Sequence, residues 1–95
     1  MSRLYLVFIF CISFSILGTT QQKQKKIIAF ADEQYDKGDY YYALEYYKQA
    51  LEKDSNSIKL LWKYAETLRA YKDYSKAESY YAKVYAREQT TIFPN

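Results

Sequence analysis

The chain has 95 residues, a formal net charge of +3 and an aromatic fraction of 20%. It is long enough for one small domain, and its charge is too small to indicate nucleic acid binding. It contains no His, two Gly and one Cys, which excludes zinc sites of Cys and His and phosphate loops that need several Gly. We therefore expect no catalytic residue, no cofactor, no metal ion and no nucleic acid partner.

The first segment has the layout of a signal peptide. Arg3 precedes an uncharged apolar run from Leu4 to Leu17, and the small residues Gly18-Thr19-Thr20 follow. Residues 4–17 would span only about 21 Å as a helix, less than the bilayer core of about 30 Å. We predict a signal peptide over residues 1–20, cleaved after Thr20, with an uncleaved N-terminal anchor as the alternative. The bulky residues before Cys11 argue against lipid attachment there.

The rest of the chain is an internal repeat. When the sequence is shifted by 34 residues, identical residues fall on one another, and such self-similarity at one fixed period is typical of stacked repeats. Within each copy the apolar and small residues follow helical spacing. The identical pairs are Ala31 and Ala65, Asp39 and Asp73, Tyr40 and Tyr74, Ala43 and Ala77, Tyr46 and Tyr80, and Tyr47 and Tyr81.

Polar turns divide the repeat into helices. Gly38 suits the left-handed conformation after a helix, and Asp39, Asp73 and Ser57 are expected N-caps. Because the intervening loops are short, neighbouring helices should be antiparallel. The predicted all-α fold has four helices: Lys23–Lys37, Tyr40–Lys53, Ser57–Tyr71 and Tyr74–Glu88.

This pattern resembles the tetratricopeptide repeat (TPR) family. The resemblance rests on Ala31 and on the run Gly38-Asp39-Tyr40-Tyr41-Tyr42-Ala43-Leu44-Glu45-Tyr46-Tyr47-Lys48-Gln49-Ala50-Leu51. The resemblance implies two tandem helix-turn-helix units, residues 23–56 and 57–90, in a fragment of an α-solenoid. Residues 91–95 would then begin an interrupted third helix or form a tail.

The 13 tyrosines divide by position in these units. Those at helix-packing positions are expected in the core, each with its hydroxyl at a polar edge. The remainder of the repeat tyrosines should face outward or toward the neighbouring unit. The predicted core set is Tyr40, Tyr47, Tyr64, Tyr74, Tyr81 and Tyr85, and the predicted outward set is Tyr41, Tyr42, Tyr46 and Tyr80.

The resemblance also implies a groove that binds a peptide or a partner protein, lined by the first helix of each unit. Trp62 stands out because Trp is enriched at binding hot spots, and the alternative is that it covers the junction between units. The mixed charges do not fit the carboxylate clamp of some chaperone-binding relatives, so an acidic C-terminal tail is not the expected ligand. The predicted groove residues are Ile28, Asp32, Tyr35, Asp36, Lys59, Trp62, Glu66 and Arg69.

Two units are fewer than such arrays usually need. We expect Tyr81, Val84 and Tyr85 on the last helix to be thinly covered, and self-association or a downstream domain to cover them.

The layout resembles the N-terminus of bacterial cell-envelope TPR proteins that continue into a propeller and an outer-membrane-protein-A-like domain. The sequence therefore predicts an exported protein-interaction scaffold, periplasmic or associated with the outer membrane. A membrane-anchored assembly factor is the alternative. The sequence shows no nucleophile–base pair that would indicate an enzyme.

Overall fold

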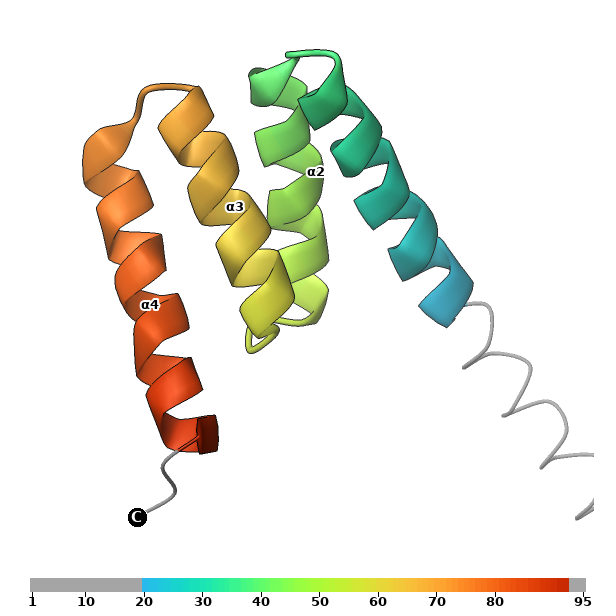
Figure 1. Ribbon diagram of the computed structural model, residues 1–95. Coiled ribbons are helices and arrows are strands. Elements are labelled where there is room, and N and C mark those ends of the chain that lie inside the picture. The colour runs from blue at the N-terminus through green and yellow to red at the C-terminus, as the bar shows by residue number, and fades with distance from the viewer. Residues whose placement is uncertain (1–19, 93–95) are drawn as a thin grey trace, which may run out of the picture.

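A computed structural model describes residues 20–92 as four helices without strands. We call residues 20–36 the leading helix; the others are α2 (Tyr40–Lys53), α3 (Ile58–Ala70) and α4 (Tyr74–Ile92). Each helix runs antiparallel to the one before it, and the four lie in chain order as a row (Figure 1). The predicted all-α fold is confirmed, and α4 is longer than expected. The predicted signal peptide lies outside the described residues except for Thr20, as do residues 93–95.

The turn after the leading helix depends on glycine. Gly38 has a φ of 82°, in the left-handed region that side chains with a Cβ adopt at a cost. Its N–H donates to the carbonyl of Tyr35 at 3.0 Å, and the N–H of Asp39 donates to the carbonyl of Gln34 at 2.9 Å. These two bonds form a Schellman motif, which satisfies the last carbonyls of the helix. The conformation predicted for Gly38 is confirmed.

The second unit makes the same turn without glycine. Lys72 has a φ of 72°, and its N–H donates to the carbonyl of Arg69 at 3.0 Å. The N–H of Asp73 donates to the carbonyl of Leu68 at 2.9 Å. Because Lys72 carries a Cβ, the second turn stores backbone strain that the first turn avoids.

Two of the three expected N-caps are confirmed. Ser57 Oγ accepts from the N–H of Leu60 at 3.2 Å, and Asp73 Oδ1 accepts from the N–H of Lys76 at 3.3 Å. The prediction for Asp39 is wrong, because its side chain makes no capping hydrogen bond to α2. Its backbone, with φ −84° and ψ 68°, lies outside the extended region that capping residues usually adopt.

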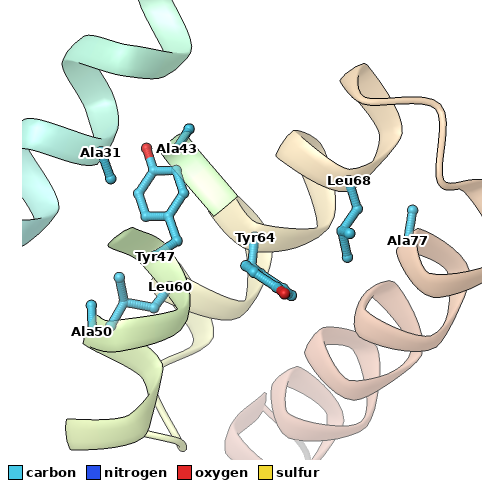
Figure 2. Packing of buried hydrophobic residues seen from close by; sticks show 8 residues of the cluster. All are labelled: Ala31, Ala43, Tyr47, Ala50, Leu60, Tyr64, Leu68 and Ala77. Carbon is cyan, nitrogen blue, oxygen red and sulfur yellow. The ribbon is translucent and has the colours of Figure 1, made fainter. Parts of the chain in front are cut away.

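The core is a seam of small residues filled by larger ones. Ala31, Ala43 and Ala50 are fully buried, so their helices can approach closely. The Tyr47 ring projects from α2 toward the leading helix beside Ala31, and Tyr64 lies between α2 and α4 (Figure 2). The buried cluster comprises Ala31, Ala43, Tyr47, Ala50, Leu60, Tyr64, Leu68 and Ala77.

An aromatic pair repeats with the sequence. Phe30 and Tyr46 meet edge to face with ring centroids 4.6 Å apart, and Tyr64 and Tyr80 do the same at 4.7 Å. Phe30 is 42% exposed but Tyr64 only 7%. Tyr64 lies on α3, which has a helix on either side in the row, whereas the leading helix lies at one end of the row (Figure 1). Position in the row therefore decides burial of equivalent residues.

The tyrosine predictions are confirmed in part. Tyr47 and Tyr64 are buried, and Tyr40 and Tyr81 are half-buried. The assignments of Tyr74 and Tyr85 to the core are wrong, because these side chains are 63% and 65% exposed. Tyr74 is the first residue of α4, and no described helix packs over Tyr85.

Residues expected outside the core also divide. Tyr41 and Tyr42 are exposed as predicted, whereas Tyr46 and Tyr80 are half-buried and pack against the core. Val84 was expected on a thinly covered face but is only 5% exposed. It replaces the fully buried Ala50 of the first unit, so it occupies the packing face of α4.

Candidate functional site

A groove of about 420 Å³ lies where the leading helix and α3 face each other, with α2 beneath them. We call it the Trp62 groove. Both walls come from the first helix of a unit, as the family resemblance implied. The groove is lined by Asp32, Tyr35, Asp36, Tyr47, Trp62, Lys63, Glu66 and Thr67.

Five of the eight predicted groove residues line this groove: Asp32, Tyr35, Asp36, Trp62 and Glu66. Arg69 joins it through Glu66, with its guanidinium 2.9 Å from the carboxylate. Ile28 and Lys59 do not line it. They meet instead in a separate pocket of about 150 Å³ toward the other end of α3.

Asp32 is the polar centre of the groove. The hydroxyl of Tyr47 donates to Asp32 Oδ1, and Lys63 Nζ donates to Oδ1 at 2.9 Å and to Oδ2 at 3.0 Å. Burial of Tyr47 raises its pKa above its ordinary value, and its hydrogen bond to Asp32 raises it further. The phenol therefore stays protonated and keeps donating to the carboxylate.

Glu66 is the equivalent carboxylate of the second unit. Tyr81 donates its hydroxyl to Glu66 Oε1 at 2.5 Å, so the tyrosine–carboxylate bond recurs 34 residues along the chain. This hydrogen bond lowers the pKa of Glu66, against a smaller opposing effect of partial burial, and Arg69 lowers it further. The Glu66 carboxylate raises the pKa of Arg69, so the pair is ionised near neutrality.

Trp62 and Asp36 are the groove residues best placed to meet a ligand. Trp62 meets Tyr81 edge to face with centroids 5.4 Å apart, yet 49% of it is exposed. Its ring partner belongs to the same predicted unit. Asp36 is exposed, and no hydrogen bond or ion pair is found for it among the described residues. An accessible aromatic face beside an uncommitted carboxylate can bind a partner without bond-making chemistry.

Sequence reasoning missed Tyr47, Lys63 and Thr67 as groove residues. Tyr47 was assigned to the core, and only its hydroxyl reaches the groove. Lys63 corresponds to Ala29 in the first unit, so the repeat carried no signal for it. Thr67 is fully buried and donates to the carbonyl of Lys63 at 2.6 Å, which places it beneath the groove.

The described part of the chain offers no metal-binding cluster of His, Cys, Asp or Glu. Within residues 20–92, no helix has both the length and the apolar character needed to cross a bilayer. The Trp62 groove is lined by aromatic rings and ion-paired side chains.

Comparison with known proteins gives one family. No curated protein and no solved structure matches the chain significantly. The tetratricopeptide repeat family matches residues 34–91, which is more than half of the chain, includes α2 and α3 and covers nearly all of α4. Repeats of this family are typically protein-interaction scaffolds without enzymatic activity. The chain, with its two helical hairpins and the groove between their first helices, belongs to the tetratricopeptide repeat family.

Proposed function

We propose that the protein is an exported interaction scaffold of the bacterial cell envelope that binds a peptide or partner protein in the Trp62 groove. The observation that carries this proposal is the 49% exposure of Trp62 inside a groove whose two other aromatic residues are better covered, Tyr35 being half-buried and Tyr47 buried. A large ring left half in solvent within a groove is a typical anchor for a partner.

The test is crosslinking from the groove in living cells. A photoreactive phenylalanine derivative replaces Trp62 in one full-length variant and Tyr41 in a matched control. Tyr41 is similarly exposed, at 56%, but does not line the groove. We expect a discrete adduct from the Trp62 position only. Equal adducts from both positions, or none from Trp62, would contradict binding in the groove.

Export to the periplasm or the outer membrane is a separate part of the proposal. It is supported by the signal-peptide layout of residues 1–20. Cell fractionation with mass spectrometry of the recovered protein tests it. We expect a protein whose N-terminus is Gln21 in the envelope fraction, and a full-length protein in the cytoplasm would refute export.

The second candidate is an assembly factor that keeps its N-terminal segment as a membrane anchor. The continuous apolar run from Leu4 to Leu17 favours it. The same fractionation separates the two, because an anchored form retains Met1 or Ser2 and resists extraction with carbonate.

Covering of the last helix by a second copy or by a further domain is the remaining proposal. The 65% exposure of Tyr85 supports it. Sedimentation of the full chain and of Tyr85→Ser tests self-association. We expect the variant to dissociate more readily than the wild type. If both sediment as monomers, a second copy does not cover this helix.

A further inference from the structure

A second cleft, of about 470 Å³, lies between α2 and α4 with α3 as its floor. It shares no lining residue with the Trp62 groove. We call it the basic cleft. Its lining residues are Lys48, Leu51, Glu52, Ser55, Leu61, Tyr64, Lys76, Tyr80, Lys83 and Arg87.

Helical spacing explains how these residues meet. Lys76, Tyr80, Lys83 and Arg87 follow one another at intervals of four, three and four, so they form one stripe along α4. Lys48, Leu51, Glu52 and Ser55 form the corresponding stripe on α2 and the turn after it. The cleft therefore runs along both helices.

The charges on its walls are unequal. Four cationic residues and one carboxylate, Glu52, line the cleft. Lys83 Nζ lies 4.2 Å from the centroid of the Tyr80 ring, which holds the cation over the cleft. Arg87 donates to Asn56 Oδ1 at 2.8 Å. Lys48, Lys76 and Lys83 are exposed, so most of this positive charge is available to a ligand.

The repeat does not require these cations. The residues 34 positions before Lys76 and Lys83 are Tyr42 and Gln49, both uncharged. By contrast, Tyr80 matches Tyr46, and both tyrosines make the edge-to-face contact that recurs in the two units. The fold thus accounts for the ring in this stripe, but the positive charge needs another explanation.

We propose that the basic cleft binds an extended acidic segment of a protein partner, with carboxylates along its edges and apolar side chains on its floor. Charge complementarity selects an acidic ligand. The accessible apolar surface comes from half-buried Leu51 and Tyr80, above a floor closed by the buried side chains of Leu61 and Tyr64. A cleft with an apolar floor that runs along two helices suits a linear peptide better than the flat surface of a membrane. This site is independent of the Trp62 groove.

Fluorescence anisotropy tests the proposal on the full chain. The probe is a short fluorescein-labelled peptide of Glu-Glu-Leu repeats, and the reference probe has Ser in place of Leu. The variant Lys76→Glu/Lys83→Glu reverses two charges in the cleft. Its matched control, Lys25→Glu/Lys26→Glu, makes the same change in net charge on exposed residues of the leading helix. Circular dichroism checks that both variants keep their helices.

We expect the cleft variant to bind the leucine probe at least about tenfold more weakly than wild type, which corresponds to about 1.4 kcal/mol. The control should stay within about twofold of wild type, and wild type should prefer the leucine probe. Equal weakening in both variants, or no binding to wild type, would overturn the proposal. A cleft variant that keeps the probe but loses vesicles of equal phosphatidylcholine and phosphatidylserine would overturn it in favour of a membrane surface.

Discussion

Replacing Lys72 with Gly should stabilise the protein. Lys72 has a φ of 72°, and a residue with a Cβ in this conformation carries a strain of about 1–2 kcal/mol. Gly removes the strain but gains more freedom in the unfolded chain, which costs about 0.5–1 kcal/mol. Loss of the Lys charge near the end of α3 costs roughly a few tenths of a kcal/mol more in free energy of unfolding. The net gain in free energy of unfolding should be about 0.5 kcal/mol.

The first unit supplies the reciprocal experiment. Gly38 has a φ of 82° and nothing within 4 Å of an added Cβ. Gly38→Ala should therefore destabilise the protein by backbone strain alone, by about 1 kcal/mol. In a domain of this size 1 kcal/mol shifts Tm by about 4–8 °C.

Thermal and urea unfolding, followed by circular dichroism of the full chain, measure both effects. Lys72→Ala is the control, because it removes the charge but keeps the Cβ and should not raise Tm. The reasoning would be refuted if Lys72→Gly lowered Tm, or if Lys72→Ala stabilised the protein as much as Lys72→Gly. Either result would mean that backbone strain at this turn does not limit stability.

Three further predictions concern the packing and the polar contacts. Tyr47→Phe should cost about 1.5–3 kcal/mol in urea unfolding, because Asp32 loses a charge-assisted hydrogen bond, whereas Tyr41→Phe should change nothing measurable. Ala50→Leu should cost about 1–3 kcal/mol by overpacking a fully buried site, and the same change at exposed Ala29 serves as control; equal effects would contradict the packing. The free energy of unfolding should depend on pH at both extremes. The raised pKa of Tyr47 gives a stabilising contribution that is complete below the ordinary tyrosine pKa of 10.0 and is lost as the pH rises above that value. The lowered pKa of Glu66 gives a contribution to stability that is present above its ordinary pKa of 4.5 and is lost as the pH falls through the pKa of the folded protein. Glu66→Gln should flatten the acid limb and Tyr47→Phe the alkaline limb, and unchanged limbs would refute these assignments.

The helices were predictable because their signals are local. The bounds of α2 agree with the prediction at both ends, and the turn at Gly38 follows from the conformational freedom of one residue. The equivalent turn at Lys72 was not predictable, because Lys carries no signal for a positive φ. Its geometry is set by the backbone bonds at the end of α3 rather than by the side chain.

Burial was harder to predict than helix position. The repeat treats Phe30 and Tyr64 as equivalent, but a residue's exposure depends on whether a helix flanks it on both sides. The same limit applies to Tyr85, which repeats Leu51 in sequence without the α3 surface that partly covers Leu51. Periodicity reveals which face of a helix is apolar, but it does not count the neighbours that cover this face.

The groove was predictable in outline only. The resemblance to the tetratricopeptide repeat family placed Asp32, Trp62 and Glu66 together, because it implies that the first helices of both units line one groove. The contribution of Lys63 depends on an ion pair between helices of different units, and nothing in the local sequence indicates it.

That ion pair has a consequence for how the two units behave together. In a repeat array, stability is the sum of what each unit supplies and what each shared boundary supplies, and the boundary decides whether units melt as one or separately. The Lys63–Asp32 bridge crosses this boundary, with side chains 25% and 41% exposed, within reach of anything that enters the Trp62 groove. A ligand cation that takes the place of Lys63 on Asp32 would weaken the coupling between the units. Binding of a ligand in the groove could then be detected as a change in the cooperativity of thermal unfolding, even when the affinity of the ligand is unknown.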